Sequence, residues 1–375
     1  MHLDVFEQPG KTNSCMDSDL LRIKEKLDSG ERLDAQDGLI LFSTQDLFGL
    51  GTLANSLKEK LHGNRVYFGV SLNINYTNLC TLRCPICAFS RDEGAADAYF
   101  LSQEEIVGRA TAARAHGVSE VHIVGGVHRD ISVAYFTELF SSLRAIDPLL
   151  NINALTATEC DYLSRKEQMP LPELFARLKE SGLGGMPGGG AEILDDTIRG
   201  VITPLKIESD RWLEVSREAH RAGVRTNATM LWGHVESYKD RIQHMLRLRV
   251  LQDETGGFKA FVPLIFHPGN TRLSHLKKVS SAAEILKVYA VSRLMLDNVA
   301  HIKALWMYLG LKFAGVALRF GADDMGGTSF DERIVHAAGS TSSVTSKETL
   351  VHQIRSMGLV PCEADSNYRV TEKDA

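Results

Sequence analysis

Residues 78–89 read Asn78-Leu79-Cys80-Thr81-Leu82-Arg83-Cys84-Pro85-Ile86-Cys87-Ala88-Phe89, and this run carries the strongest structural signal in the chain. The thiols of Cys80, Cys84 and Cys87 have the spacing C-x3-C-x2-C, so one short loop can surround a single small inorganic group. Three thiolates on a four-iron cluster leave one iron without a protein ligand, whereas ordinary electron-transfer clusters close that position with a fourth cysteine. The run therefore predicts a 4Fe-4S cluster held by Cys80, Cys84 and Cys87, with one iron open to an external chelate.

Three other interpretations of these cysteines were open on the sequence. A structural zinc site takes four ligands, and no His or Cys follows at the spacing of a zinc finger. Disulfides would leave one of the three thiols unpaired, and nothing in the sequence suggests secretion. Inert thiols are the third interpretation, and this is how we interpret Cys15, Cys160 and Cys362. The tight spacing favours the cluster over these alternatives.

The composition is that of a globular protein with a sizeable core: 375 residues, 44% of them hydrophobic and 24% charged. This length suits one large α/β barrel or two ordinary domains. The net charge of −5 argues against nucleic acid as the main partner, because phosphate binding needs a basic face. No apolar run reaches the ~18 residues of a membrane span, and the N-terminus lacks the apolar core of a signal peptide. We therefore expect no membrane partner and a cytoplasmic location.

The first 64 residues are predicted to form a helical cap. Residues 1–16 are expected to be disordered, and from Met16 to His62 leucines recur at helical spacing, with Leu20, Ile23 and Leu27 on one face. We assign this segment no chemistry. The rest of the chain is divided into a barrel (65–340) and a C-terminal helix and tail (341–375), and the end after Asp365 is expected to be loose.

From Arg65 onward, strand-like and helix-like segments alternate. Strands are predicted at 66–74, 120–124, 151–156, 183–186, 224–231, 258–264, 302–307 and 316–320, with helices between them and one near Leu311. Such alternation with short connections is typical of an α/β protein with a parallel sheet. About eight strand–helix units predict a (β/α)8 TIM-type barrel. The alternative is a partial, six-stranded barrel with extra C-terminal elements.

In a barrel, the chemistry gathers at the ends of the strands. Gly125-Gly126 follows the second predicted strand and either lets the backbone approach a ligand or forms an ordinary turn. Glu159 follows the third predicted strand. Its carboxylate either binds a ligand or is a solvated acid of the loop. Gly189 lies in a run of three glycines after the fourth strand, which a purely structural loop rarely needs, and Glu192 beyond it is a candidate ligand-binding acid.

Polar residues also follow the later strands. Thr229 is expected to point inward from the fifth strand. His234 and His267 follow the fifth and sixth strands, and each is either an acid–base group or a satisfied core histidine. Four cations could hold substrate carboxylates or else form surface ion pairs: Arg225, Arg293, Lys303 and Arg319. Asp323-Asp324 is either a ligand-binding pair or a helix N-cap.

The cysteine spacing resembles the signature of the radical S-adenosylmethionine (SAM) enzymes. In that family the open iron holds the amino and carboxylate groups of SAM, and an electron from the cluster releases a 5′-deoxyadenosyl radical. The resemblance implies that SAM binds near Tyr76 and Phe89, which flank the cysteine run, and near Gly125-Gly126. These glycines resemble a family turn that binds the methionine amino group, although here Val127 stands where the family has an acid.

A narrower resemblance, over about residues 53–340, is to the radical SAM enzymes of the futalosine route to menaquinone. It is carried by the runs Pro187-Gly188-Gly189-Gly190-Ala191-Glu192, Arg225-Thr226-Asn227-Ala228-Thr229-Met230, Leu251-Gln252-Asp253-Glu254-Thr255-Gly256-Gly257-Phe258 and Phe266-His267-Pro268-Gly269-Asn270-Thr271. That family contains an aminofutalosine synthase and a dehypoxanthine futalosine cyclase. Four features are similar to the synthase: Asn227, His267, the strand that contains Lys303 and the Asp323-Asp324 turn. Gly269 favours the cyclase.

The synthase chemistry that this resemblance implies consumes SAM. The adenosyl radical adds to the enol-ether double bond of 3-[(1-carboxyvinyl)oxy]benzoate, and rearrangement with loss of a carboxylate as carbonate gives 6-amino-6-deoxyfutalosine. His234, His267 and Arg293 are then the predicted catalytic residues. A flavodoxin or ferredoxin is the implied reductant. The alternatives are the cyclase, which abstracts hydrogen, a cluster protein that only carries electrons, and a zinc-dependent barrel hydrolase.

Overall fold

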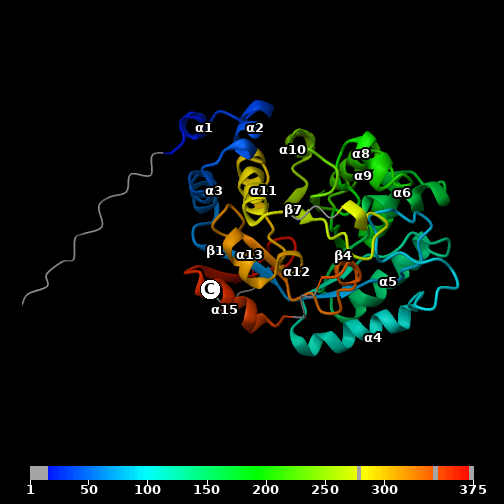
Figure 1. Cartoon of the computed structure of the whole chain (residues 1–375). Coiled ribbons are helices and arrows are strands. Elements are labelled where there is room, and N and C mark those ends of the chain that lie inside the picture. Colours follow the sequence, from blue (N-terminus) through cyan, green and yellow to red (C-terminus); the bar gives the residue numbers. More distant parts are fainter. Residues whose placement is uncertain (1–15, 277–279, 341–344, 371–375) are drawn as a thin grey trace, which may run out of the picture.

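Three helices precede the first strand in the computed structural model, which describes residues 16–276, 280–340 and 345–370. They are α1 (Ser18–Ser29), α2 (Ala35–Ser43) and α3 (Leu47–His62). Each begins at an aspartate whose side chain accepts hydrogen bonds from backbone N–H groups of the first turn, as N-caps do: Asp17, Asp34 and Asp46. Both α2 and α3 pack against α11 (Ala282–Met295) on the outside of the barrel (Figure 1). The predicted helical cap is confirmed, and the expected disorder of residues 1–15 lies outside the described residues.

The strands form three parallel sheets. The first runs β2 (Ser71–Ile74), β3 (Glu120–Ile123), β4 (Asn151–Ala154), β5 (Leu183–Gly185), and the second runs β6 (Thr226–Trp232), β7 (Phe258–Ile265), β8 (His301–Ile302). The third has β1 (Arg65–Gly69) between β9 (Asp324–Gly327) and β10 (Val360–Glu363). Strands β2 and β4 are buried along their whole length, as expected where helices cover one face and side chains fill the other.

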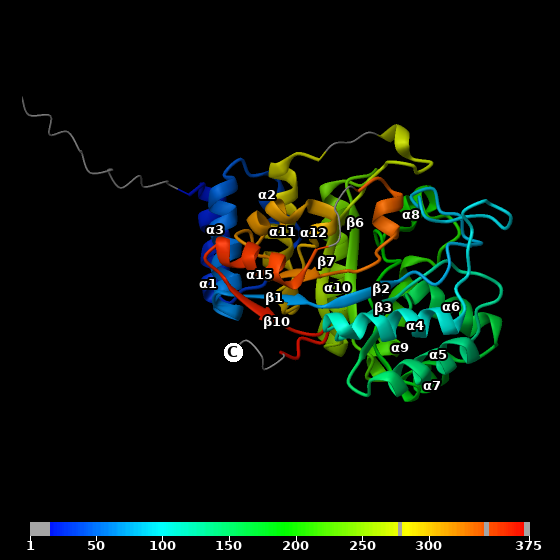
Figure 2. The same cartoon turned by 90° about the horizontal axis from the view of Figure 1, so that it is seen from below.

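Single bridges connect these sheets into a ring. Met186 pairs with Thr226 between β5 and β6, Lys303 pairs with Asp324 between β8 and β9, and Leu72 pairs with Phe330 beyond β9. Because β2 follows β1 directly, this last contact closes the ring on the strand where it began. The structure therefore confirms the predicted α/β barrel, with β10 as an additional strand beside β1 (Figure 2).

Helices cover the outside of the barrel. They are α4 (Gln103–Ala113), α5 (Val133–Ile146), α6 (Ala157–Lys166), α7 (Leu171–Glu180), α8 (Asp196–Ile202), α9 (Ser209–Arg221), α10 (Tyr238–Thr255), α11, α12 (Trp306–Leu309), α13 (Leu311–Ala317), α14 (Ile334–Ala337) and α15 (Lys347–Ser356). Helix α9 buries Trp212, Val215 and Ala219, which recur at the three-to-four-residue spacing of one helix face. No helix in the described ranges has both the length and the apolar character needed to cross a bilayer.

Three predictions about the strands and the C-terminal end were wrong. Residues 66–74 form two strands with different partners, because β1 pairs with β9 and β10 whereas β2 pairs with β3. Residues 316–320 are not a strand: α13 extends to Ala317 and packs on α15, and the strand follows at β9. The chain directly after Asp365 is not loose, since Ser366 is buried, and residues 371–375 lie outside the described residues. The predicted domain boundaries at residues 64 and 340 stay a prediction.

Candidate active site

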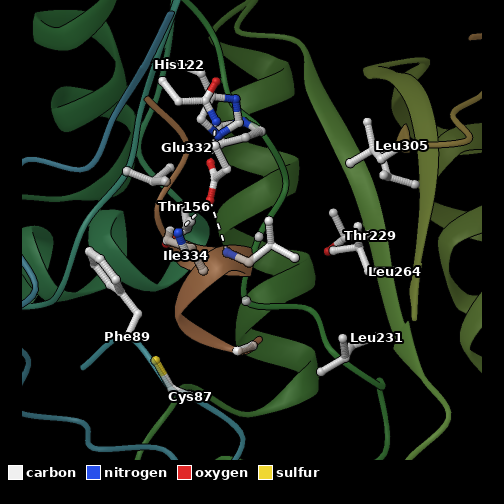
Figure 3. Close-up of a pocket in the computed structure, with 18 of the residues that line it drawn as sticks. Cys87, Phe89, His122, Thr156, Thr229, Leu231, Leu264, Leu305, Glu332 and Ile334 are labelled. Carbon is white, nitrogen blue, oxygen red and sulfur yellow. Dashed lines mark hydrogen bonds between the residues drawn. The ribbon is translucent and has the colours of Figure 1, made fainter. Parts of the chain in front are cut away.

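A cavity of about 400 Å³ lies inside the barrel and opens to the loops that follow the strands. Cys80, Cys84 and Cys87 line it together with the loops after β3, β4, β5 and β7. Figure 3 shows Cys87 and Phe89 at one end of the cavity and His122 and Glu332 at the other. The structure thus places the three cysteines in one compartment with most of the predicted site residues.

Backbone hydrogen bonds fix the cysteine loop to its neighbours. Cys80 N donates to the carbonyl of Arg91 at 3.2 Å, and Thr81 N donates to the carbonyl of Val127 at 2.9 Å, which joins the loop to the turn after β3. On the other side, Arg272 N donates to the carbonyl of Pro85 at 3.1 Å. The loop is therefore held between the β3 and β7 sides of the barrel mouth.

The three thiols are free and face the same cavity, as a cluster with three cysteine ligands requires. Burial raises the pKa of Cys84 to about 11, and the nearby cation of Lys206 opposes this shift. A positive charge beside thiolate ligands offsets part of the negative charge of a bound cluster. The residues present therefore fit a 4Fe-4S cluster.

Gly126 lies at the closest approach between the turn after β3 and the cysteine loop. A Cβ atom at this position would come within 2.1 Å of the Leu79 carbonyl oxygen and 2.9 Å of the Cys80 Cβ. No side chain fits there, so Gly126 sets the position of the first cysteine. Gly125 and Gly126 both line the cavity, as predicted for residues near the cofactor.

The carboxylate of Glu159 forms hydrogen bonds that hold this turn in place. Its Oε1 atom accepts hydrogen bonds from the Tyr76 hydroxyl at 2.7 Å and from Gly125 N at 3.3 Å, while Oε2 accepts from Thr156 N at 2.7 Å in the capping box of α6. Burial raises the pKa of Glu159 above its usual value, and these hydrogen bonds oppose the shift. Glu159 lines the cavity, whereas Tyr76 lies behind the turn and does not, so the prediction that SAM binds near Tyr76 stays a prediction.

Glu192 and Lys206 form a buried ion pair beside the cysteine loop. Lys206 Nζ lies 2.6 Å from Glu192 Oε1, and both residues line the cavity with Gly189. Burial would raise the pKa of Glu192, but Lys206 and Arg199 bring it below its usual value. Burial would lower the pKa of Lys206, but Glu192 and Cys84 raise it. Both groups therefore stay charged at neutral pH.

The remaining predicted residues of the cavity wall are Phe89, Thr229 and His267. Thr229 Oγ1 donates to the carbonyl of Gly188 at 2.8 Å, which ties β6 to the triple-glycine loop. His267 Nε2 lies 3.2 Å from the carbonyl of Tyr308, and burial lowers the pKa of the imidazole. His267 is therefore neutral at pH 7, with its Nδ1 atom available as a proton acceptor.

Two buried polar atoms of the wall lack a hydrogen-bond partner among the described residues: Thr158 Oγ1 and Asn227 Oδ1. Both residues line the cavity. Buried polar atoms usually have a partner, so these two mark positions where a ligand can form hydrogen bonds. A compartment with such atoms and several glycines fits SAM.

Two predicted catalytic residues lie outside the cavity. His234 is turned away: its Nε2 atom donates to the carbonyl of Leu231 at 2.9 Å, and its Nδ1 atom accepts from Val235 N at 2.8 Å. Arg293 is buried in α11, where its guanidinium lies 2.5 Å from Asp323 Oδ1. Neither residue lines the cavity, and the contacts of both side chains are with the protein itself, so their catalytic roles stay a prediction that this geometry does not favour.

Asp323 is a structural residue too. Its carboxylate lies 2.6 Å from His301 Nδ1 and 3.6 Å from His62 Nε2, in addition to Arg293. The two histidines and Asp323 could in principle bind a metal ion, but the guanidinium beside them disfavours a cation. Neither Asp323 nor Asp324 is the N-cap of a helix in the described part of the chain. Of the four predicted carboxylate-binding cations, Lys303 lines the cavity, whereas Arg225, Arg293 and Arg319 do not.

Sequence reasoning missed His122, Lys206 and Glu332, which all line the cavity. His122 lies on β3 between Glu120 and Val124, and these three alternate residues face inward. The two-residue period of a strand could have identified His122 once the register was known. Glu332 is held by Ile334 N at 2.6 Å and by the Asn73 side chain, and it comes from a loop far along the chain that no local pattern marks.

The chain is similar to known proteins in sequence and in fold. A radical SAM superfamily model matches residues 74–248, and a model described as CofH/MqnC C-terminal region matches residues 255–374. The crystal structure of methylornithine synthase superposes with a TM-score of 0.73 over 92% of this chain and 98% of that chain, at 18% identity. This last likeness concerns the fold alone.

Among curated relatives, aminodeoxyfutalosine synthase from Thermus thermophilus is 41% identical over 94% of this chain and 96% of the relative. The 5-amino-6-(D-ribitylamino)uracil–L-tyrosine 4-hydroxyphenyl transferase from Methanoculleus marisnigri is 40% identical over 87% of this chain and 90% of the relative. Matches of this extent, on a barrel with three free cysteines in its cavity, define the family. The chain belongs to the radical SAM enzymes, with a 4Fe-4S cluster and SAM as its cofactors, and within them to the family of aminodeoxyfutalosine synthase and its transferase relatives.

Proposed function

We propose that this enzyme joins the 5′-deoxyadenosyl group of SAM to 3-[(1-carboxyvinyl)oxy]benzoate and so forms 6-amino-6-deoxyfutalosine. The observation that carries the proposal is that one cavity extends from the cysteine loop to Lys303, with apolar residues between them, including Val262, Leu264 and Leu305. An aromatic ether with a carboxylate at each end matches that succession of charge and apolar surface. The 41% identity to a synthase over nearly the whole chain supports the same substrate.

When bound, the cluster supplies the electron that splits SAM and makes its C5′ carbon reactive. The contribution of the protein is to hold that carbon against the vinyl carbon of the second substrate, since positioning is the main catalytic effect available for such an addition. Gly125, Gly126 and the Glu192–Lys206 pair form the wall at the SAM end. The apolar residues of the middle section exclude water from the reacting atoms.

Lys303 is the cation proposed to hold a substrate carboxylate. Its Nζ atom lies 3.0 Å from Asp324 Oδ2, and it lines the cavity. Burial would lower the pKa of Lys303, but Asp324 and Glu120 raise it above its usual value, so the ammonium stays charged. A charged donor is the stronger partner for a carboxylate.

In the late step, the radical left by addition and rearrangement would expel the vinyl carboxylate as the CO2 radical anion, and one electron would return to the oxidised cluster. His267 is the proposed base that accepts the proton released when this CO2 is hydrated to hydrogencarbonate. Its lowered pKa keeps the imidazole neutral, and a neutral imidazole can accept a proton from attacking water. Its position near the mouth, after β7, is where water would enter. A small electron-transfer protein such as flavodoxin or ferredoxin is the proposed reductant.

A second candidate function is the transfer of a 4-hydroxyphenyl group, as the names of several relatives state. Their identity to this chain reaches 40%, close to that of the synthase, so overall similarity separates the two activities weakly. A third candidate is the cyclase of the same pathway, which would release 5′-deoxyadenosine rather than incorporate the adenosyl group. The masses of the products distinguish all three.

The test is anaerobic reconstitution with iron and sulfide, followed by incubation with SAM, a reductant and each substrate in turn. We expect a product whose mass contains both the adenosyl group and the benzoate, formed only with 3-[(1-carboxyvinyl)oxy]benzoate. A product from tyrosine and the ribitylaminouracil would replace this proposal with the transferase. Free 5′-deoxyadenosine in amounts equal to a cyclised product would replace it with the cyclase.

A further inference from the structure

The chain that follows β10 crosses the amino-terminal ends of the barrel strands, opposite the cysteine loop. Ala364 N donates to the carbonyl of Phe68 at 2.9 Å, which continues the pairing of β10 with β1. Figure 2 shows this part of the chain, in red, beside β1. The cysteine loop follows the carboxyl end of β2, so the two segments lie at opposite ends of the barrel.

Ser366 is buried among side chains of three strands. Its backbone N–H donates to Glu120 Oε2 at 2.9 Å. Its Oγ atom accepts hydrogen bonds from Asn151 Nδ2 at 2.8 Å and from Lys259 Nζ at 3.0 Å. These partners come from the first or second residue of β3, β4 and β7, so one serine joins widely separated parts of the ring.

Tyr368 anchors the other end of the segment. Its hydroxyl donates to Asp324 Oδ2 at 2.7 Å, and its ring stacks on the imidazole of His301 with the ring centres 3.4 Å apart. Lys303 Nζ lies 5.3 Å from the centre of the same ring. The segment is therefore fixed to the lysine that faces the substrate cavity and to that lysine's carboxylate partner.

Ser366 also lines the large cavity. A smaller cavity of about 40 Å³ lies between the C-terminal segment and the strands. The residues that line both cavities are Ser71, Glu120, Lys303, Gly326, Gly327 and Ser366. The two cavities therefore share part of their walls, and the C-terminal segment itself reaches the large cavity through Ser366.

We propose that residues 364–368 are the floor of the substrate cavity, closing it to solvent and setting how deeply the aromatic substrate can enter. The proposal rests on the proposed function only for the identity of the substrate. Closure of the floor itself follows from the contacts of Ser366 and Tyr368. The alternative is that the segment only packs the end of the chain against the barrel and has no effect on the cavity.

The closed floor has a chemical consequence. A thiol reductant that entered from below could give its S–H hydrogen atom to the adenosyl radical carbon, forming 5′-deoxyadenosine and a thiyl radical. Each such event consumes SAM without product. The ratio of 5′-deoxyadenosine to adduct therefore measures how well the floor excludes such donors.

The first experiment needs no cluster or substrate. A chain that stops after Glu363 is compared with a matched chain that stops after Val370, which keeps the floor and removes only residues 371–375. Both cluster-free proteins are treated with acetic anhydride, and the acetylation of Lys259 is compared by peptide mass with that of Lys60. Lys259 is 0% exposed, whereas the Lys60 side chain is 69% exposed.

In the wild type and in the chain ending at Val370, we expect Lys259 to react at least about tenfold more slowly than Lys60, because acetylation of a buried amine requires local opening. In the chain ending at Glu363 the two rates should agree within about threefold, since the protecting segment is gone. Equal protection of Lys259 from acetylation in both truncated chains would overturn the proposal that residues 364–368 close the cavity, provided that both chains retain the wild-type circular dichroism spectrum.

The second experiment tests the depth of the cavity in the full chain. Ser366→Leu places a larger side chain at the floor, and Arg369→Leu is the matched control at an exposed position of the same segment. We expect Ser366→Leu to raise the KM for the benzoate about tenfold, because overpacking shortens the cavity, and to leave the Kd for SAM unchanged. Because a displaced benzoate would meet the adenosyl carbon less often, more of the radical should be quenched by a thiol in solution, which should also raise the ratio of 5′-deoxyadenosine to adduct.

An unchanged KM and ratio in Ser366→Leu would show that the segment does not shape the substrate site. If the wild type itself formed no adduct from the benzoate, the proposed function would fail, and the acetylation experiment would still decide whether residues 364–368 close the barrel.

Discussion

Gly126 illustrates how one missing side chain fixes the geometry of the cluster site. A Cβ added here would overlap the Leu79 carbonyl oxygen and the Cys80 Cβ, so the two loops approach each other more closely than a side chain at this position would allow. Backbone contact is harder to adjust than contact between flexible side chains. The position of the first cysteine therefore depends on a residue that supplies no functional group.

Gly126→Ala is expected to displace the cysteine loop. The new Cβ would come within 2.1 Å of a carbonyl oxygen, so the backbone must move and the cluster should be bound in substoichiometric amounts. Gly108→Ala is the matched control, because a Cβ there meets nothing within 4 Å and Gly108 lies within α4. That control should gain about 0.5–1 kcal/mol in the free energy of unfolding. Iron and sulfide content, measured beside thermal unfolding, checks both expectations.

Cys84→Ala should abolish both the cluster spectrum and turnover, because two remaining thiolates cannot hold the cluster as three do. The control is Cys362→Ala, which removes a thiol on β10 that lies away from the cavity. It should keep the full iron content and the activity. Visible absorbance and iron analysis after reconstitution provide the measurement, and an active Cys84→Ala enzyme would contradict the cluster assignment.

At the level of elements, β8 and β9 show how short strands position a residue that lines the cavity. They are connected by the bridge between Lys303 and Asp324, and the same two side chains form an ion pair at 3.0 Å. The ion pair positions the ammonium at the cavity wall. Under the proposed function, removing the Lys303 ammonium would weaken binding of the benzoate more than binding of SAM.

Lys303→Gln is therefore expected to raise the KM for the benzoate by about tenfold or more, the scale of a lost charge-assisted hydrogen bond. Cleavage of SAM in the absence of the second substrate should be unchanged, which separates a substrate-binding role from a general structural one. Lys60→Gln, at an exposed position of α3, should leave both quantities unchanged. Steady-state kinetics under anaerobic conditions, with both products quantified, gives the comparison.

Much of the site could be predicted because the elements that carry it are locally encoded. The three cysteines, Gly125-Gly126, Glu192 and His267 each belong to a short pattern next to a strand, and the structure places them in one cavity. Lys206 and Glu332 could not be predicted this way, since they reach the cavity only through tertiary contacts with Glu192 and Asn73. The ion pair of Arg293 with Asp323 could not be predicted either, because Asp323 is 30 positions away along the chain.

The same limit explains the errors in the fold. Residues 316–320 are apolar enough for a strand, yet Ala314 and Ala317 are buried at helical spacing against α15, and packing decided the outcome. The single predicted strand at 66–74 divides because its two halves have different neighbours. Strand β10 is short and partly exposed, and only its pairing with β1 defines it as part of the sheet.

At the scale of the whole molecule, buried neutral histidines make stability depend on pH. Burial lowers the pKa of His244 to about 3, whereas in the unfolded chain it is near 6.5. Above pH 6.5 neither the folded nor the unfolded state binds a proton at His244, and the folded protein has the full stability that the neutral histidine allows. As the pH falls below 6.5 the unfolded state takes up a proton that the folded state excludes, so the stability is lost at about 1.4 kcal/mol per pH unit down to about pH 3.

His244→Asn should reduce the slope of unfolding free energy against pH between 6.5 and 4 by about 1.4 kcal/mol per unit. His352→Asn, at an exposed position of α15, should leave the slope unchanged. Denaturant titrations of the cluster-free chain at several pH values give the slopes. Identical slopes for the wild type and His244→Asn would show that His244 is protonated inside the folded protein.

Because Arg65 pairs with Val360, β1 can complete its pairing only after β10 has been synthesised. On the ribosome, nearly three hundred residues separate the emergence of Arg65 and Val360, and β9, the other partner of β1, is also synthesised late, so β1 spends most of translation with both edges unpaired. Contacts between such distant residues form slowly, and exposed strand edges invite association with other chains. Recombinant production should therefore benefit from chaperones that shield nascent strands, and a chain stalled before β10 is synthesised would leave the outer edge of β1 without its partner.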